Sequence, residues 1–179
     1  MKIIRFVAIF AIALLVTACP YSSEIPLSAP KEKVPQQLLG KWISPSDAEK
    51  EAENMKMMPE YREKLFPTYH VITSIDKFSV KIDKFEFQST DSTYTSKPHT
   101  AHITTVGNVV FLQVKPSDEA KYYFYKMVFP TAETMELYPV SDYITEVFTG
   151  SDEMKSFFDK YKELSFFYSA KEEYKKSKN

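Results

Sequence analysis

The chain has 179 residues, of which 44% are hydrophobic and 15% aromatic, and its formal net charge at pH 7 is −1. This near balance of charge gives no electrostatic reason to expect binding to nucleic acid or to anionic lipid head groups. With 3 glycines and a single cysteine, the composition favours one domain with a large aromatic core and excludes an intramolecular disulfide framework.

The first eighteen residues have the layout of a secretory signal. Lys2 and Arg5 precede an apolar run from Phe6 to Val16, and a cationic start followed by a short apolar segment is typical of export signals. The run is shorter than the roughly twenty apolar residues of a membrane-spanning helix. We therefore predict that residues 1–18 are a signal peptide. Its removal leaves 21 basic and 24 acidic residues, a net charge of −3.

The end of this segment carries a more specific motif. Val16-Thr17-Ala18-Cys19 resembles the lipobox of bacterial lipoproteins, in which the signal is cut before an invariant cysteine. The resemblance implies that the Cys19 thiol takes a diacylglycerol and that its new amine receives a further acyl chain such as palmitate. The alternative is an ordinary signal peptide that ends near a buried cysteine. Because Cys19 has no partner for a disulfide, the lipid site explains it better.

Residues 19–36 are predicted to form a lipidated tether. Pro20, Pro26, Pro30 and Pro35 exclude a helix or a central strand and favour a semi-extended chain. By analogy with bacterial sorting rules, Pro20 after the cysteine, where an inner-membrane retention signal usually has Asp, favours location of the protein at the outer membrane. The lack of an acidic cluster close behind it favours the periplasmic side over the cell surface.

Residues 37–179 are predicted to form the folded domain. A short strand from Leu38 to Ile43 opens it, and Ser46 with Glu49 has the spacing of a capping box that starts a helix. Ala48, Ala52, Met55 and Met58 follow at helical spacing, and Pro59 ends or kinks the helix.

From Tyr69 the apolar period changes to two, which indicates strands. In the second of these, Phe85 and Phe87 fall out of phase with Val80, which predicts a bulge near Asp83-Lys84. The predicted strands and polar hairpin span residues 69–75, 78–87, 88–105, 110–115, 122–129 and 135–140, and tight turns join them.

A second helix is predicted to begin at Ser151 or Asp152, before a final strand from Ser165 to Tyr174. Its apolar side would carry Met154, Phe157, Phe158, Tyr161 and Leu164. The predicted fold is thus mainly β, an antiparallel up-and-down meander of about seven to nine strands with two short helices. The sheet would close as a barrel or pack as a sandwich.

Gly40-Lys41-Trp42 on the first strand resembles the Gly-X-Trp element that opens lipocalins. The resemblance implies that Trp42 sits at the closed end of a barrel over residues 37–179 and that the other end takes a small apolar ligand. Lipocalins usually stack a late arginine on this tryptophan. Here Lys171 or Lys175 would have to replace it, because Arg62 is the only arginine after the signal peptide.

No residue pattern points to catalysis or to a metal. His99 and His102 are three positions apart, so on a strand they would face opposite sides, and a third ligand is not evident. Nucleophile elbows and phosphate-binding loops are also missing from the sequence. We therefore expect a non-enzymatic protein without a cofactor or a metal.

Two functional hypotheses remain. In the first, the sheet body captures a small apolar ligand in a pocket lined by Phe78, Val80, Val110 and Tyr125. In the second, the domain has a filled core and acts through contacts with an envelope protein, as an inhibitor or immunity-type lipoprotein does. An interior pocket favours the first hypothesis, and a filled interior favours the second.

Overall fold

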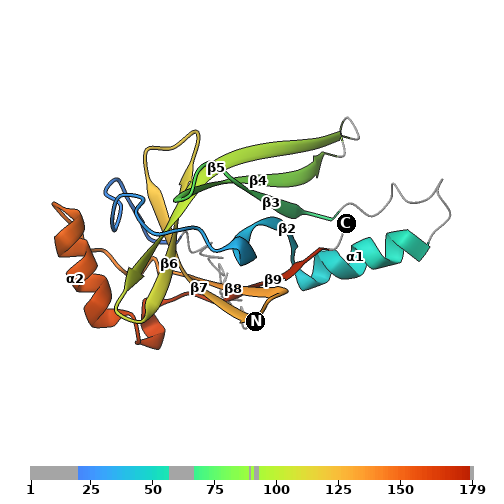
Figure 1. The fold of residues 1–179 in the computed structure, drawn as a ribbon. Coiled ribbons are helices and arrows are strands. Elements are labelled where there is room, and N and C mark those ends of the chain that lie inside the picture. Colours follow the sequence, from blue (N-terminus) through green and yellow to red (C-terminus); the bar gives the residue numbers. More distant parts are fainter. Residues whose placement is uncertain (1–19, 57–66, 89, 91–92, 178–179) are drawn as a thin grey trace, which may run out of the picture.

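The computed structural model of the protein describes residues 20–56, 67–88, 90 and 93–177. The predicted signal peptide (residues 1–18) and Cys19 lie outside the described residues. Within them, the chain forms one antiparallel sheet and two α-helices (Figure 1). The strands are β1 (Ser22–Ser23), β2 (Gly40–Ile43), β3 (Tyr69–Ser74), β4 (Ser79–Gln88), β5 (Thr93–Val106), β6 (Val109–Pro116), β7 (Tyr122–Thr131), β8 (Thr134–Pro139) and β9 (Glu172–Lys176). The helices are α1 (Pro45–Lys56) and α2 (Ser151–Tyr161), with short 3-10 turns η1 (Gln36–Leu38) and η3 (Ser165–Phe167).

Strands β2 to β9 close into an eight-stranded barrel. From β2 to β8 each strand pairs with the next one in the chain, and β9 pairs with both β8 and β2. The two-residue strand β1 pairs with the start of β7, outside this closed set. The predicted fold, a mainly β up-and-down meander with a lipocalin-like barrel and two short helices, is therefore confirmed.

The connections distinguish the two ends of the barrel. Short turns join β3 to β4, β5 to β6 and β7 to β8 at one end, where η1 also leads into β2. We call this the closed end. The opposite end, which we call the open end, carries the connection through α1 and the turn between β6 and β7.

The barrel wall has an apolar core on each of its faces, because alternate residues of a strand point to opposite sides. The interior cluster contains Trp42 and Leu112 among its buried residues. The outer cluster contains Phe111 and Phe124, and Phe158 of α2 packs onto both rings. In Figure 1, α1 and α2 lie on opposite sides of the barrel. Among the described residues, the outer core lies under α2.

The Gly-X-Trp element begins at the closed end, where η1 leads into β2. Trp42 is fully buried, and its Nε1–H donates a hydrogen bond of 2.8 Å to the carbonyl oxygen of Leu38. Lys176 places its Nζ 5.4 Å from the centre of the Trp42 ring. It is therefore Lys176, and neither Lys171 nor Lys175, that covers the tryptophan. The reason is the register of the barrel closure, which sets Trp42 opposite Lys176.

Residues 20–36 do not form a free tether; they pack along the outer wall of the barrel. The backbone N–H of Tyr21 bonds the carbonyl oxygen of Val140 at 2.8 Å. Leu27 is 1% exposed, and its N–H donates to Oε1 of the buried Gln113 at 2.6 Å. The tether prediction is therefore wrong for these residues. Prolines exclude a helix, but they leave an extended chain free to pack on a sheet.

The predicted bulge near Asp83-Lys84 is absent, because β4 pairs with β3 and β5 in unbroken register. Phe85 and Phe87 instead lie on the outer face of β4. There Phe85 stacks on Tyr69 with ring centres 4.9 Å apart, and Phe87 meets Tyr94 at 5.6 Å. This part of the β4–β5 hairpin projects beyond the barrel (Figure 1), so its aromatic residues pack on one another.

The start of α2 agrees with the prediction, whereas the segment that follows the helix does not. Helix α2 begins at Ser151 and buries Met154 and Phe158, as expected. Leu164 lies beyond the helix and is 42% exposed. The final strand is shorter than predicted and begins only at Glu172, because η3 takes up the start of that segment.

Candidate ligand cavity

A cavity of about 540 Å³ occupies part of the barrel interior. This volume lies within the range of roughly 300–1,000 Å³ that is typical of small-molecule sites. Apolar side chains from five strands form its deeper wall. They are Trp42, Ile72, Ile82, Leu112, Val114, Met135 and Leu137. The barrel is therefore not filled by its own side chains.

The cavity extends to the open end of the barrel. Pro116 and Tyr123, which flank the turn between β6 and β7, line it, and so do Ser44 and Thr68 on either side of the connection through α1. Pro20, the first described residue, also lines this part of the cavity. The polar lining residues include Asp47, His70, Lys84, His99 and Glu172.

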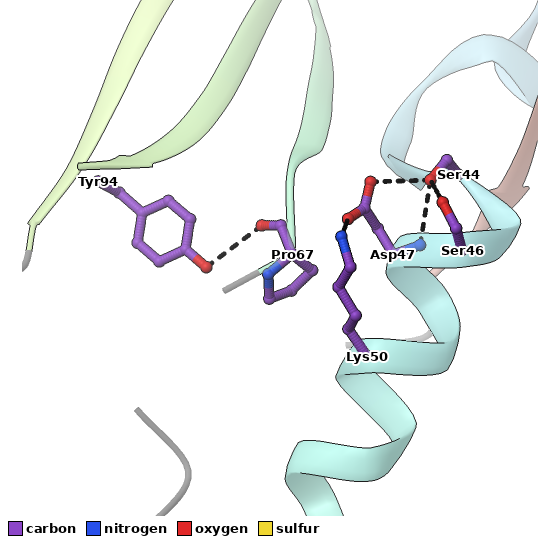
Figure 2. A network of polar contacts seen from close by, with 6 residues as sticks. All are labelled: Ser44, Ser46, Asp47, Lys50, Pro67 and Tyr94. Carbon is purple, nitrogen blue, oxygen red and sulfur yellow. Dashed lines mark hydrogen bonds and ion pairs between the residues drawn. The ribbon is translucent and has the colours of Figure 1, made fainter. Parts of the chain in front are cut away.

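Asp47 is held at the cavity by the start of α1 (Figure 2). Its carboxylate accepts a hydrogen bond of 2.8 Å from Ser44 Oγ and pairs with Lys50 Nζ at 2.7 Å. Burial alone would raise the pKa of Asp47, but the bonds from Lys50 and Ser44 outweigh it and lower the pKa. A negative charge at this position is thus already neutralised by neighbouring donors.

The same contacts correct the predicted helix start. The backbone N–H of Asp47 donates to Ser44 Oγ at 3.1 Å, and α1 begins at Pro45. Ser44 is therefore the capping residue, whereas Ser46 lies inside the helix. The reason is Pro45, whose fixed φ and missing N–H suit the first helical position.

His70 and His99 reach the cavity from β3 and β5, on either side of β4. The Nδ1 atoms of both rings are buried and have no hydrogen-bond partner within the described part of the chain. Burial, with added effects from Lys84 and His99, lowers the pKa of His70 from 6.5 to about 4. Burial also lowers the pKa of His99. Both imidazoles are therefore neutral near pH 7.

Phenolic and acidic groups of β7 and β9 also line the cavity. The hydroxyl of Tyr174 donates a hydrogen bond of 2.7 Å to Glu172. Burial, followed by the charge of Glu172, raises the pKa of both Tyr125 and Tyr174. These tyrosines stay protonated and act as hydrogen-bond donors or acceptors.

Of the four residues predicted to bind ligand, Tyr125 lines the cavity. Val80 is fully buried in the interior cluster, and Val110 packs against that cluster, but neither lines the cavity. Phe78 lies in the turn between β3 and β4 at the closed end. The strand period gave the inward face correctly for Val80 and Val110. The period does not tell how far along the barrel axis a residue lies. Val80 and Val110 lie near the closed end, whereas the cavity lies towards the open end.

Sequence reasoning missed the polar lining residues. His70 precedes the inward Ile72 by two positions, and Lys84 follows the inward Ile82 by two. Both are therefore on the inner face by the strand period, which is a signal that the sequence contained. The predicted bulge near Asp83-Lys84 interrupted this alternation, so Lys84 was not assigned to the inner face.

The described residues contain no group of three or more histidine, cysteine or acidic side chains that could hold a metal ion. His99 lines the cavity, whereas His102 faces the outer wall and places its Nε2 2.8 Å from the carbonyl oxygen of Ser28. The two histidines thus point to opposite faces, as predicted. No described helix is both long enough and apolar enough to cross a membrane.

Comparison with known proteins found no matching family model, no matching curated protein and no matching solved structure.

Proposed function

We propose that this protein is a lipid-anchored, lipocalin-like envelope lipoprotein that binds a small apolar ligand in its barrel without catalysis. The observation that carries the proposal is the cavity of about 540 Å³ with its apolar deeper wall inside a closed barrel. Apolar surface at the bottom of such a cavity favours the entry of an apolar group, because the group leaves water on binding.

The Gly-X-Trp element supports the lipocalin-like part of the proposal. Gly40 has a φ of +125°, and a Cβ at this position would lie 2.9 Å from Cε of Lys176. The absence of a side chain thus leaves room for Lys176 over Trp42, where lipocalins usually have an arginine. The Lys176 ammonium also donates to the carbonyl oxygen of Gln37 at 3.1 Å, which ties η1 to the closed end.

The lipobox supports the anchor. In the proposal, Cys19 carries the lipid and holds the protein on the outer membrane, on the periplasmic side. Consecutive Cα atoms are about 3.8 Å apart, so a lipid on Cys19 begins one residue from Pro20, which lines the cavity. The open end of the barrel would then face the bilayer from which an apolar ligand comes.

Native mass spectrometry of the soluble body, residues 20–179, tests ligand binding. We expect a co-purified or added apolar molecule to bind with one-to-one stoichiometry. A matched variant, Leu112→Trp, fills the deeper wall and should lose binding while it stays folded by circular dichroism. Binding that persists in this variant, or an empty protein after exposure to envelope lipid extract, would contradict the carrier function.

Labelling with a palmitate analogue tests the anchor separately. The full-length protein should take up label, and Cys19→Ser should not, because the thioether lipid precedes further acylation. Label in the Cys19→Ser variant would exclude Cys19 as the lipid site and would leave the carrier function untouched.

One observation favours the second hypothesis, a protein–protein role. Tyr143 is 86% exposed and Val147 is 90% exposed, in the segment between β8 and α2. Exposed large apolar side chains mark contact sites when they lie together. Replacing both with serine would abolish such a role and should leave ligand binding in the barrel unchanged.

A further inference from the structure

Three polar side chains form a group on adjacent strands inside the barrel, near the open end. His70 of β3 lies directly opposite Lys84 of β4, and His99 of β5 lies opposite Ile82, diagonally next to Lys84. All three side chains line the cavity. Directly opposite and diagonal neighbours on one face of a sheet are within reach of the same small group. The ring of Tyr174 contacts His70 edge-on, with centres 5.4 Å apart, and holds its orientation.

This group has unused hydrogen-bonding capacity. The buried Nδ1 atoms of His70 and His99 have no partner among the described residues. Leaving a buried polar atom unpaired is unfavourable, so a bound partner for these atoms adds to affinity. The ion pair of Lys84 with Glu86, at 2.5 Å, occupies one of the three N–H donors of the ammonium.

The carboxylates around the open end, in contrast, already have donors. Asp47 is bonded by Ser44 and Lys50. Glu172 accepts a hydrogen bond from Tyr174, and Glu119 accepts one of 2.6 Å from Tyr123. Glu86 forms an ion pair with Lys84. Two further charges affect the pKa of His99. Asp118 in the β6–β7 turn raises it, and Lys97, which lies opposite Lys84, lowers it. The open end thus offers donors to a ligand more readily than acceptors.

We propose that His70, Lys84 and His99 form a head-group subsite for the acidic group of a single-chain amphiphile. Its tail lies on the apolar wall nearer the closed end, formed by Ile72, Ile82 and Leu112. The ammonium and one imidazole N–H donate to the acidic head, because charge-assisted hydrogen bonds to a carboxylate are stronger than neutral ones. This inference rests on the proposed carrier function. It adds the chemical class of the ligand and the residues that select it.

Titration of the soluble body with dodecanoic acid and with dodecanol tests the subsite. The single tryptophan lines the cavity and reports occupancy through its fluorescence. We expect the acid to bind at least about tenfold more tightly than the alcohol. Lys84→Met should reduce this preference to about threefold or less. Lys81→Met is the matched control, because Lys81 is exposed on the outer face of the same strand and should keep the full preference.

A second variant separates the imidazole from the ammonium. His70→Phe keeps the ring contact with Tyr174 but removes Nδ1, so it should weaken binding of the acid more than binding of the alcohol. Equal binding of acid and alcohol by the unaltered protein, or an unchanged preference in both Lys84→Met and His70→Phe, would overturn the subsite and leave the carrier function standing. A protein that binds neither compound would overturn both.

Discussion

Gly40 shows how a single residue shapes the closed end of the barrel. Its φ of +125° lies in a region that residues with a Cβ rarely adopt. A Cβ added to this residue would meet Cε of Lys176 at 2.9 Å. Backbone strain and displacement of Lys176 therefore act together at this position.

We predict that Gly40→Ala lowers the free energy of unfolding by about 2 kcal/mol, since a left-handed backbone with a Cβ costs roughly 1–2 kcal/mol and the contact adds to it. Urea denaturation measures the change. Gly150→Ser is the control, because Gly150 has an extended φ of −163° and no atom within 4 Å of an added Cβ. Equal losses in the two variants would contradict the proposed role of Gly40.

His70 makes stability depend on pH. Because burial and the neighbouring Lys84 and His99 lower its pKa from 6.5 to about 4, the unfolded chain binds a proton at a higher pH than the folded chain does. The free energy of unfolding is therefore fully present above pH 6.5 and falls as the pH decreases towards 4.

We predict that this histidine alone lowers the stability of the ligand-free protein by roughly 3 kcal/mol at most across that interval. His70→Gln should flatten the corresponding part of the stability curve, measured by thermal unfolding at stepped pH. His99 and His102, whose pKa values are also lowered by burial, contribute to the slope that remains, as do carboxylates with lowered pKa values such as Asp47 and Glu86. An identical slope in the variant would show that His70 is not the group that titrates.

At the scale of elements, the extended segment before η1 acts as part of the barrel wall. It supplies Leu27 to the outer core, and Ser151 Oγ of α2 donates to the carbonyl oxygen of Pro26 at 2.6 Å. Gln113 joins it to the sheet, since its side chain also donates to Thr104 Oγ1 at 2.5 Å. These contacts satisfy the polar atoms of the fully buried Gln113 side chain.

We predict that Leu27→Ala lowers the free energy of unfolding by about 2–5 kcal/mol, as expected for a leucine in a packed core. Leu164→Ala is the matched control; this leucine is 42% exposed, and its loss should cost about 0.5 kcal/mol or less. Chemical denaturation of both variants compares them directly. If the segment were a free tether, the two changes would have equally small effects.

At the scale of the whole molecule, the packed segment from Pro20 bears on where the proposed anchor lies relative to the cavity. Tyr21 is bonded to Val140, and Pro20 lines the cavity at the open end. Under the proposed function, a lipid on Cys19 would therefore hold the barrel close to the bilayer. Close approach shortens the path of an apolar ligand through water, where its transfer is unfavourable.

We predict that a flexible insert of about twelve glycine and serine residues between Cys19 and Pro20 slows ligand transfer between vesicles and the anchored protein severalfold, because its ends separate by roughly 20 Å. Stopped-flow fluorescence of the tryptophan measures the rate. The soluble bodies with and without the insert should have equal affinities, and the same insert after Asn179 should leave transfer unchanged. An unchanged rate with the first insert would contradict an open end held at the membrane.

The local period of apolar residues predicted most of the strands, the inward face of residues such as Val80, and the two helices. It misplaced a bulge in β4 and the start of the final strand, because packing and pairing decide these features. The sequence also contained the lipobox and the Gly-X-Trp element, whose functional meaning remains a prediction. The tertiary structure decided which lysine covers Trp42, since that choice depends on the register between β2 and β9, which are far apart in the chain. It also decided the depth of the cavity and the packing of residues 20–36. The grouping of His70, Lys84 and His99 is of the same kind, because strand pairing and barrel closure bring together residues that no local pattern relates.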